Sequence, residues 1–431
     1  MSKLKVFEAF AGVGSYTMAL RNLGIDFELV GISEIDRYAI LSHDAIHGDN
    51  REIKIPSKEE MLKEFEEKHI AYNFSNGKSE IPRGLKDITK LYKAHMRSKN
   101  YGDIQLIKPE DLPSMDLLTL SSPCKNISVA GLMEGLEEGS GTQSSLIWSS
   151  FKIVEYHKPK YIIFENVKNL VSNKFKPYFD MICDKFNNLN YNCYWSVLNG
   201  KDFNVPQNRE RVMMLCIRKD IDKGVFNMPI GTPTTKCLKD ILLDDVEDRY
   251  YIPKPMLEKF IPNENFKTLY GDINPQKPTE LGFIQKGEDG VKHQSNTVYD
   301  GDCVSCTLCA RDWKSPKMFM VEGKPVKLGG CFDEPNGTTH QTRNVWEKEG
   351  VVPTVDTMQD EYRQPLAFSN QMKIRKLTPV ECWRLMGFKD EDFFKAQAIG
   401  LSNTKLYERA GRGIVVPMLE SIFRNMMLNE E

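Results

Sequence analysis

A chain of 431 residues can form one large domain with a second beside it, or two to three small ones. Apolar residues make up 40% and charged residues 27%, as in ordinary soluble globular proteins, and no apolar run approaches the roughly 20 residues that cross a bilayer. The net charge of -2 argues mildly against a nucleic-acid partner, although residues 311–327 hold a local excess of lysine and arginine.

The chain begins without the long apolar stretch of a signal peptide, so we expect a cytosolic protein whose ten cysteines stay reduced. Residues 3–9 are predicted to form a strand that ends at the glycine turn AGVG, and residues 15–23 a helix that stops at Gly24. A second strand over 27–34 and a helix over 37–48 follow. Strand, glycine turn, helix and strand together predict the opening of a doubly wound α/β sheet.

Residues 51–100 interrupt this pattern. A capping box of Ser57 and Glu60 precedes apolar residues at helical spacing in SKEEMLKEFEEKHI. The rest of the region is polar and rich in lysine, and we interpret 51–100 as a surface insertion.

Short apolar strands return after residue 103. Residues 115–123 and 161–167 are apolar runs that end in polar residues, as buried parallel strands do. An amphipathic helix is predicted between them, and residues 211–219 form a further apolar strand. The alternating elements extend the α/β pattern to this point.

The composition changes beyond about residue 225, where Pro, Gly, Asn and Asp become frequent and the strands look short and irregular. Residues 304–317 and 351–365 resemble each other weakly in sequence; we call them the two echo segments and predict that they form similar strand–loop elements. Helical patterning resumes in LTPVECWRLMGF, where Thr378 before Pro379 predicts a helix start, and the chain closes with a helix.

Two features near the start of the chain are typical of a nucleotide or cofactor pocket. Gly12 and Gly14 lie between the first strand and the first helix, where backbone can approach a ligand at the positive end of the helix. The third glycine of the dinucleotide fingerprint is missing, so a simple tight turn is an equal alternative. Glu34 ends the second strand where an acid can bind ribose hydroxyls, although an acid there is often only solvated.

Two later strand ends carry residues suited to catalysis. Cys124 follows Pro123 in the crevice where open α/β sheets bind ligands, and a thiolate is a strong nucleophile. The alternative is a buried core cysteine. Glu165 and Asn166 close the next strand, where a carboxyl with a pKa raised by burial can act as an acid. The alternative for Glu165 is a solvated loop acid or a helix cap.

Three side chains alternate in PQNRERV, namely Gln207, Arg209 and Arg211. If this segment is extended, they point to one face, and two arginines with an amide suit a negative or carbonyl-rich ligand. The alternative is an edge strand with a charged face.

Two groups of potential metal ligands are predicted not to bind metal. The CxxCxxC of Cys303, Cys306 and Cys309 suggests a zinc site, which needs four ligands. Against zinc, the similar segment 351–365 lacks the second and third cysteines. His43 and His47 lie one helical turn apart, and we expect a solvated helix face because no third ligand is visible.

In their order along the chain, these motifs resemble those of the DNA (cytosine-5)-methyltransferases over nearly the whole length. AFAGVGS is similar to that family's cofactor glycine motif, SEID to its ribose-acid motif, and GDI at 102–104 to the motif whose aspartate meets the adenine amino group. PCKNIS, FENV, QNRER and RKLTPVECWRLMGF match the later motifs. Lys125 departs from the usual Pro-Cys-Gln, and Gly411-Arg412-Gly413 departs from the usual Gly-Asn-Ser. The second departure leaves a catalytically impaired DNA-binding homologue as an alternative.

The resemblance implies methylation of cytosine C5 within a short recognition sequence of duplex DNA, with S-adenosylmethionine as cofactor. It assigns the nucleophile that adds to cytosine C6 to Cys124, and the acid that holds and protonates ring nitrogen N3 to Glu165. Arg211, supported by Arg209, would anchor the base and the active-site loop. Because the target atom lies inside the duplex, the base must flip out.

The resemblance also assigns the cofactor pocket. The adenine would stack on Phe10 and its amino group would meet Asp103, the ribose would bind Glu34, and the methionine end would lie along the glycine turn. The full implied set is Phe10, Gly12, Gly14, Glu34, Ile35, Asp103, Ile104 and Pro123.

The expected fold is a Rossmann-like methyltransferase sheet with a smaller, mostly β and irregular target-recognition domain. We expect a catalytic domain over 1–222, the recognition domain over 223–403, and a C-terminal return to the catalytic domain over 404–431. The resemblance implies a monomer in the cytoplasm of a prokaryotic or phage-infected cell, without membrane contact. Its partner would be double-stranded DNA, and a restriction endonuclease acting on the same site is a candidate partner.

Two other enzyme classes are weighed against this prediction. A transfer-RNA cytosine-5 methyltransferase shares the catalytic motifs but lacks an extended recognition domain, so the long region 225–370 argues against it. An amino-methyltransferase acting on adenine or on cytosine N4 would carry a Pro-Pro-Tyr or Pro-Pro-Trp type of motif, which we do not find in the sequence.

Overall fold

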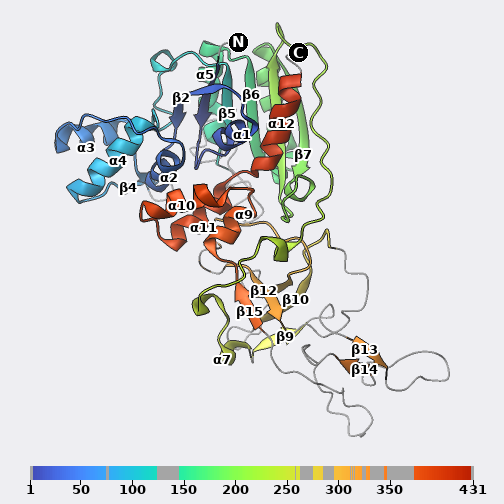
Figure 1. The fold of residues 1–431 in the computed structure, drawn as a ribbon. Helices are drawn as coiled ribbons and strands as arrows, with labels where there is room; N and C mark the ends of the chain where they lie inside the picture. Colours follow the sequence, from blue (N-terminus) through green and yellow to red (C-terminus); the bar gives the residue numbers. More distant parts are fainter. Residues whose placement is uncertain are drawn as a thin grey trace.

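The computed structural model describes residues 3–73, 77–123, 145–257, 259–262, 275–284, 296–310, 312, 314, 316–322, 327–330, 344–346 and 373–428. Figure 1 shows a larger body built around a sheet and, below it, a smaller part made of short strands. Cys124 and the second echo segment, 351–365, lie outside the described residues, so the similarity of the two echo segments stays a prediction.

A six-stranded sheet in the order β2-β1-β5-β6-β8-β7 forms the centre of the larger body. Neighbouring pairs among β2, β1, β5 and β6 run parallel, whereas β8 lies antiparallel to both β6 and β7. This arrangement confirms the predicted Rossmann-like α/β sheet. The strands are β1 Leu4–Ala9, β2 Phe27–Ser33, β5 Leu117–Leu120, β6 Tyr161–Val167, β7 Tyr191–Asn199 and β8 Glu210–Arg218.

Helices cover both faces of this sheet, which explains why its central strands are continuous apolar runs. Alternate strand residues face opposite sides: Val6 packs in a core with α1 and α12, whereas Phe7 packs in a second core with α5 and α6. The C-terminal helix α12 lies against α1, at the start of the chain (Figure 1). These helices are α1 Ser15–Leu23, α5 Leu146–His157, α6 Lys176–Asn188 and α12 Val416–Leu428.

The region 51–100 folds as a helical pair with a small core of its own. The predicted capping box is confirmed, since Ser57 and Glu60 cap α3 through both of its hydrogen bonds. Phe65 of α3 and Leu91 of α4 pack with Ile40 of α2, so the region is docked on the main body. The elements are α2 Arg37–His47, α3 Lys58–Glu67, β3 Tyr72–Asn73, β4 Lys78–Ser79 and α4 Leu85–Arg97.

A second sheet, in the order β15-β12-β11-β10-β9, forms the smaller part. Its core contains Leu281, Val298, Met318 and Ile374. The strands are β9 Phe260–Pro262, β10 Glu280–Ile284, β11 Thr297–Asp300, β12 Met318–Glu322 and β15 Lys373–Lys376; β13 Lys327–Gly330 pairs with β14 Asn344–Trp346, and α7 is Lys254–Leu257. The 3-10 helices among the residues that the structure describes are Pro109–Asp111, Lys168–Val171, Gly200–Asp202, Leu238–Ile241 and Asp248–Tyr250.

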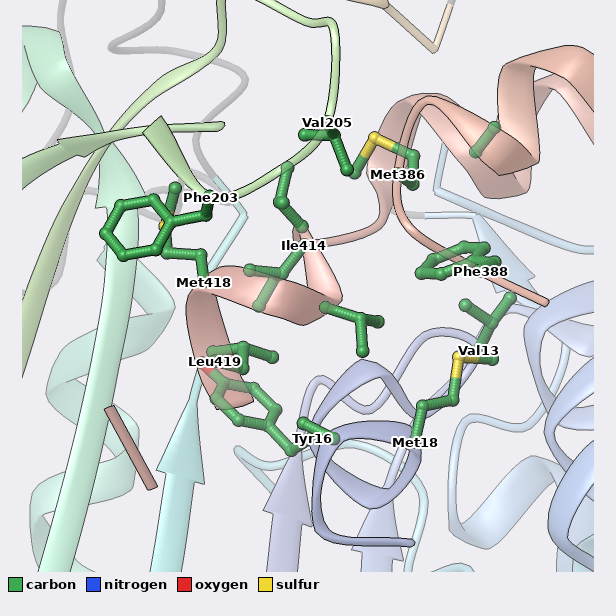
Figure 2. Packing of buried hydrophobic residues seen from close by; sticks show 14 of the residues in the cluster. Val13, Tyr16, Met18, Phe203, Val205, Met386, Phe388, Ile414, Met418 and Leu419 are labelled. Atoms are coloured by element: carbon green, nitrogen blue, oxygen red, sulfur yellow. The ribbon is translucent and has the colours of Figure 1, made fainter. Parts of the chain in front are cut away.

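Three helices, α9 Pro379–Arg384, α10 Asp390–Ala398 and α11 Asn403–Arg412, follow the second sheet. They share a core with the glycine turn and α1, and Figure 2 shows Phe388, from the segment between α9 and α10, near Val13 of the turn. The domain limits at 223 and 403 stay a prediction, and this packing favours a second limit near residue 377. No helix within the described ranges is long and apolar enough to span a membrane.

The core of the helical pair can be tested by deleting one ring. Phe65→Ala should lower the free energy of unfolding by about 3–5 kcal/mol, because Phe65 is fully buried between α3, α4 and α2. Urea denaturation followed by circular dichroism measures this change. Glu66→Ala, at the exposed neighbouring position, should stay within about 0.5 kcal/mol of the parent. Equally small effects would contradict the existence of a packed core here.

Candidate active site

The glycine turn between β1 and α1 has a left-handed backbone at Phe10, Gly12 and Gly14. Gly14 is the N-cap of α1, and a Cβ there would lie 2.5 Å from Nε2 of His47, so only glycine fits. A Cβ at Gly12, by contrast, would meet nothing within 4 Å, so the space beside the turn is open. The helix N-terminus is therefore accessible to a ligand beside Gly12.

The prediction of a solvated histidine pair is wrong. The His43 side chain is 1% exposed, and burial lowers its pKa to about 4. Nε2 of His47 lies 3.0 Å from the carbonyl of Val13, and burial holds the pKa of His47 well below its usual range. Both rings pack against the glycine turn at Gly14, because the apolar face of α2 lies next to it. Among the described residues, no group of three or more His, Cys, Asp or Glu side chains could hold a metal.

The end of β2 lies next to this turn. Oε2 of Glu34 accepts a hydrogen bond from the Gly12 N–H at 2.9 Å, and Oε1 accepts from the N–H groups of Ile35 and Asp36 at 2.8 Å. Burial, reinforced by the neighbouring Asp36, raises the pKa of Glu34. The structure therefore brings the predicted ribose acid and the glycine turn together.

A side chain that sequence reasoning missed connects this region to Asp103. Oδ1 of Asn100 accepts from the N–H groups of Glu34 and Gly102, and its Nδ2 donates to the Glu34 carbonyl. Asp103 is buried beside this turn, and Ile104 belongs to the core against which Phe10 packs. An amide two residues before the glycine of GDI was the available signal. All of these predicted cofactor residues thus lie along the carboxyl ends of β1 and β2.

A buried carboxyl that the sequence analysis also missed lies behind the turn. Oε1 of Glu8, in β1, accepts from the backbone N–H of Thr17 at 2.7 Å and also from its hydroxyl. Burial raises the pKa of Glu8 to about 7, although the Thr17 contacts oppose that shift. An acid inside an otherwise apolar strand was the signal for this position.

Glu165 and Arg211 form the second part of the site, at the far end of β6 and the beginning of β8. Oε1 of Glu165 lies 3.0 Å from Nε of Arg211, and the two side chains are only 12% and 13% exposed. Burial raises the pKa of Glu165, and the charges of Arg211 and Arg209 oppose that rise. A carboxyl held in this way can keep a proton closer to neutral pH than an exposed glutamate.

Asn166 connects Glu165 to the segment before the predicted nucleophile. Nδ2 of Asn166 donates to Oγ of Ser122 at 3.2 Å, and the hydroxyls of Tyr16 and Ser121 lie 2.9 Å apart. Pro123 comes next, and Cys124 lies outside the described residues. The chain that leads into position 124 is therefore fastened to both β6 and α1.

The three alternating side chains of PQNRERV do not share one ligand. Arg211 pairs with Glu165, whereas buried Arg209 donates to the carbonyls of Leu308, Gly411 and Gly413 at 2.8 to 3.0 Å. Nε2 of Gln207 donates to the carbonyl of Leu385. Only Arg211 lies inside β8, which begins at Glu210, so the segment is not extended throughout.

The Gly411-Arg412-Gly413 segment is closely packed. A Cβ at Gly411 would lie 2.5 Å from the Cys309 backbone, and one at Gly413 would lie 2.7 Å from the Phe388 ring. Arg412 and Arg409 both contact Oδ2 of Asp36 at 2.8 Å. Burial alone would raise the pKa of Asp36, but the two arginines hold it well below its usual range.

An open, largely parallel sheet with a glycine turn, acids at the ends of β2 and β6 and an arginine on the adjacent strand defines a Rossmann-like methyltransferase. A family model described as C-5 cytosine-specific DNA methylase matches residues 78–428. The chain therefore belongs to the C-5 cytosine-specific DNA methylase family, which confirms the predicted DNA cytosine methyltransferase.

Individual relatives agree with this result. The type II methyltransferase M2.ScrFI of Lactococcus lactis subsp. cremoris is 32% identical over 99% of this chain and 100% of its own. The orphan methyltransferase M.SPBetaI of Bacillus phage SPbeta is 30% identical over 99% of this chain and 98% of its own. The crystal structure of the S. pombe Dnmt2 methyltransferase covers 99% of this chain and 98% of its own with a TM-score of 0.54. At 15% identity, that likeness shows the fold alone.

Glu8 makes the stability of the protein depend on pH. Its pKa is about 7 in the folded protein, against 4.5 as the ordinary value, so the folded state binds more protons between these limits and stability falls as pH rises through them. Glu8→Gln removes this loss. The difference in the free energy of unfolding between Glu8→Gln and the parent should therefore rise, in favour of the variant, by about 3 kcal/mol between pH 4.5 and pH 8.

Urea denaturation at four pH values in this range tests the Glu8 prediction. Glu59→Gln, at an exposed position of α3, controls for the loss of one negative charge. Stability curves of Glu8→Gln and parent that stay parallel from pH 4.5 to 8 would contradict the assigned pKa.

Proposed function

We propose that this enzyme methylates C5 of cytosine within a short recognition sequence of duplex DNA by base flipping and a covalent bond between Cys124 and cytosine C6. The observation that carries the proposal is the buried Glu165–Arg211 pair, whose neighbour Asn166 is bonded to Ser122, two residues before the thiol. The acid thus lies next to the residue that is fastened to the segment leading to the nucleophile, which supports the proposal that both act on one flipped base.

The reaction needs C5 to become nucleophilic. Addition of the Cys124 thiolate to C6 moves the ring electrons toward C5, and a proton from Glu165 on N3 favours the addition because it neutralises the developing charge. C5 then takes up the methyl group. Loss of the C5 proton to a base, departure of the Cys124 thiolate and return of the N3 proton to Glu165 restore the aromatic ring. The raised pKa of Glu165 supports its role as the proton donor.

The two arginines take different parts in this proposal. Arg211 holds the Glu165 carboxyl and, as the resemblance implies, anchors the base. Arg209 is assigned as a positioning residue, because its three carbonyl contacts fix the segments around Leu308 and Gly413 rather than reach toward Glu165. The flipped base would therefore meet one guanidinium directly.

The family and the fold imply use of S-adenosylmethionine, which supplies an electrophilic methyl group when bound. The open space beside Gly12, the accessible N-terminus of α1, and the acids Glu34, just after β2, and Asp103 fit such a ligand. We assign to this pocket Phe10, Gly12, Gly14, Glu34, Ile35, Asp103, Ile104 and Pro123.

We propose that the smaller part, built on the second sheet, reads the DNA sequence and that the duplex lies between it and the larger body. A sheet of five strands after residue 223 favours DNA over transfer RNA, because the RNA enzymes lack an extended recognition domain. The enzyme is proposed to act as a monomer in the cytoplasm of a prokaryotic or phage-infected cell. Its candidate partner is a restriction endonuclease of the same specificity, as the type II name of M2.ScrFI suggests; the orphan name of M.SPBetaI represents the alternative.

Replacing the nucleophile tests the proposed covalent step. Cells that express the parent chain should carry modified cytosines at one short motif in bisulfite sequencing, and Cys124→Ser should abolish them because a hydroxyl is a far weaker nucleophile than a thiolate. Cys183→Ser, a thiol replacement in α6, should leave the pattern unchanged. Methylation that persists without the Cys124 thiol, or a failure of DNA containing 5-fluorocytosine to trap position 124, would refute the assignment.

Replacing the acid separates binding from chemistry. Glu165→Gln keeps the shape and a hydrogen bond but cannot deliver a proton, so we expect methyl transfer to slow by about 10²- to 10⁴-fold while DNA affinity stays similar. Single-turnover assays with tritiated cofactor and gel-shift titrations measure the two effects. Glu210→Gln, at the start of β8, is the matched control and should react at nearly the parent rate. An unchanged rate in Glu165→Gln would exclude proton donation by this residue.

A further inference from the structure

The turn that ends α3, residues 68–72, lies across the proposed adenosine pocket. The N–H of Asp103 donates to the carbonyl of Lys68 at 3.0 Å, and the N–H of Ala71 donates to the carbonyl of Ile35 at 2.8 Å. A Cβ at Gly102 would lie only 2.2 Å from the Lys68 carbonyl oxygen. The turn is therefore bonded both to the segment after β2 and to the loop that carries Asp103, which the cofactor would span.

One side chain of this turn contacts the carboxylate assigned to the adenine. Nδ1 of His69 lies 2.8 Å from Oδ2 of Asp103, and because an ionised carboxylate has no proton to give, Nδ1 is the donor. Oδ1 of Asp103 accepts from the Gln105 N–H at 3.0 Å, so the carboxylate is held from two sides. Asp103 is 2% exposed and His69 is 38% exposed, which places the ring at the rim of the pocket.

The backbone of the turn is strained in a way that aims this ring. His69 and Ala71 both have left-handed backbones, at φ 52° and 60°, which residues with a Cβ adopt at a cost of about 1–2 kcal/mol each. The His69 ring stacks on Tyr72 with centroids 4.8 Å apart and planes 21° from parallel. Such strain persists only where the surrounding structure maintains it, and it is concentrated at functional sites, so it supports a functional role for this turn.

We propose that the helical insertion supplies one wall of the cofactor pocket and that His69 is a positioning residue, which turns the Asp103 carboxylate toward the amino group of the adenine. The inference rests on the proposed function and deepens it, because it adds to the pocket a segment that had been interpreted as a surface feature. Without the His69 donor, Asp103 keeps the Gln105 contact but can rotate its second oxygen away from the ligand. Recognition of the adenine amino group should then weaken.

Isothermal titration calorimetry with two ligands tests the inference. One ligand is S-adenosylhomocysteine, and the other is the analogue in which oxygen replaces the adenine amino group. The parent should prefer the adenine form by about tenfold, as expected for one hydrogen bond to a charged group. His69→Ala and Asp103→Asn should both lose most of this preference, whereas His69→Asn, which retains a donor near the Nδ1 position, should keep it. Glu66→Ala, an exposed change one turn earlier, is the control and should bind both ligands as the parent does.

The outcomes separate the possible failures. Unchanged preference in His69→Ala would overturn the inference alone, and an equal loss of affinity for both ligands would overturn the positioning role of His69, because it would show that the turn acts only as a wall of the pocket. A folded parent that binds neither ligand would instead refute the proposed cofactor pocket, and the inference with it. Should His69→Ala not fold, as shown by its thermal unfolding, His69→Phe takes its place, because it keeps a ring beside Tyr72 but has no donor for Asp103; unchanged preference in that variant would overturn the inference.

Discussion

One buried guanidinium joins three parts of the chain that lie far apart in the sequence. Arg209, just before β8, donates to the carbonyls of Leu308 near the second sheet and of Gly411 and Gly413 at the C-terminal end of α11. Hydrogen bonds from a charged donor are worth roughly 1.5–3 kcal/mol each, which can offset the cost of burying the charge. Because Arg211, which pairs with Glu165, follows two residues later, at the start of β8, the position of the proposed catalytic pair depends on this junction.

A second buried pair carries the connection onward. The two terminal nitrogens of the Arg375 guanidinium contact the carboxylate of Glu381, at 3.0 and 2.8 Å, where the last strand of the second sheet leads into α9. Glu381 also accepts from the backbone of Thr378 and Leu243. Removing either partner would leave an uncompensated charge in the interior, so the angle between the second sheet and the helices that follow is closely constrained. Any DNA between the two parts would therefore contact two surfaces whose relative orientation depends on this ion pair.

The sequence predicted most elements whose signals are local. The helix at Ser15–Leu23 was found with its limits, because a glycine turn and a terminal glycine punctuate it, and the capping boxes at Ser57 and Thr378 mark real helix starts. It did not predict α4, whose apolar positions are scattered among lysines, or α6 and β7. The motifs likewise located the strand ends of the site, since each motif combines a buried run with a polar end.

What the sequence could not supply were the partners of its polar residues. His43 and His47 have the spacing of a solvated helix face, and only the packing of α2 against the glycine turn buries His43 and partly buries His47. Arg209 and Arg211 alternate as ligand-binding residues do, yet they point to different partners because the regular strand begins only at Glu210. Neither fact is encoded locally, since both depend on segments at least 30 residues away.

The departure from Gly-Asn-Ser near the C-terminus is also explained by contacts with segments that are distant in the sequence. The Phe388 ring fills the space that a side chain at 413 would need, and the Cys309 backbone does so at 411. The arginine between these glycines reaches Asp36, which caps α2 and follows Glu34 by two residues. The segment therefore lacks the amide and the hydroxyl of the usual motif, but its Arg412 forms an ion pair with Asp36, just after β2. That ion pair orients the strand end on which the proposed ribose contact depends, which favours an active enzyme over an impaired homologue.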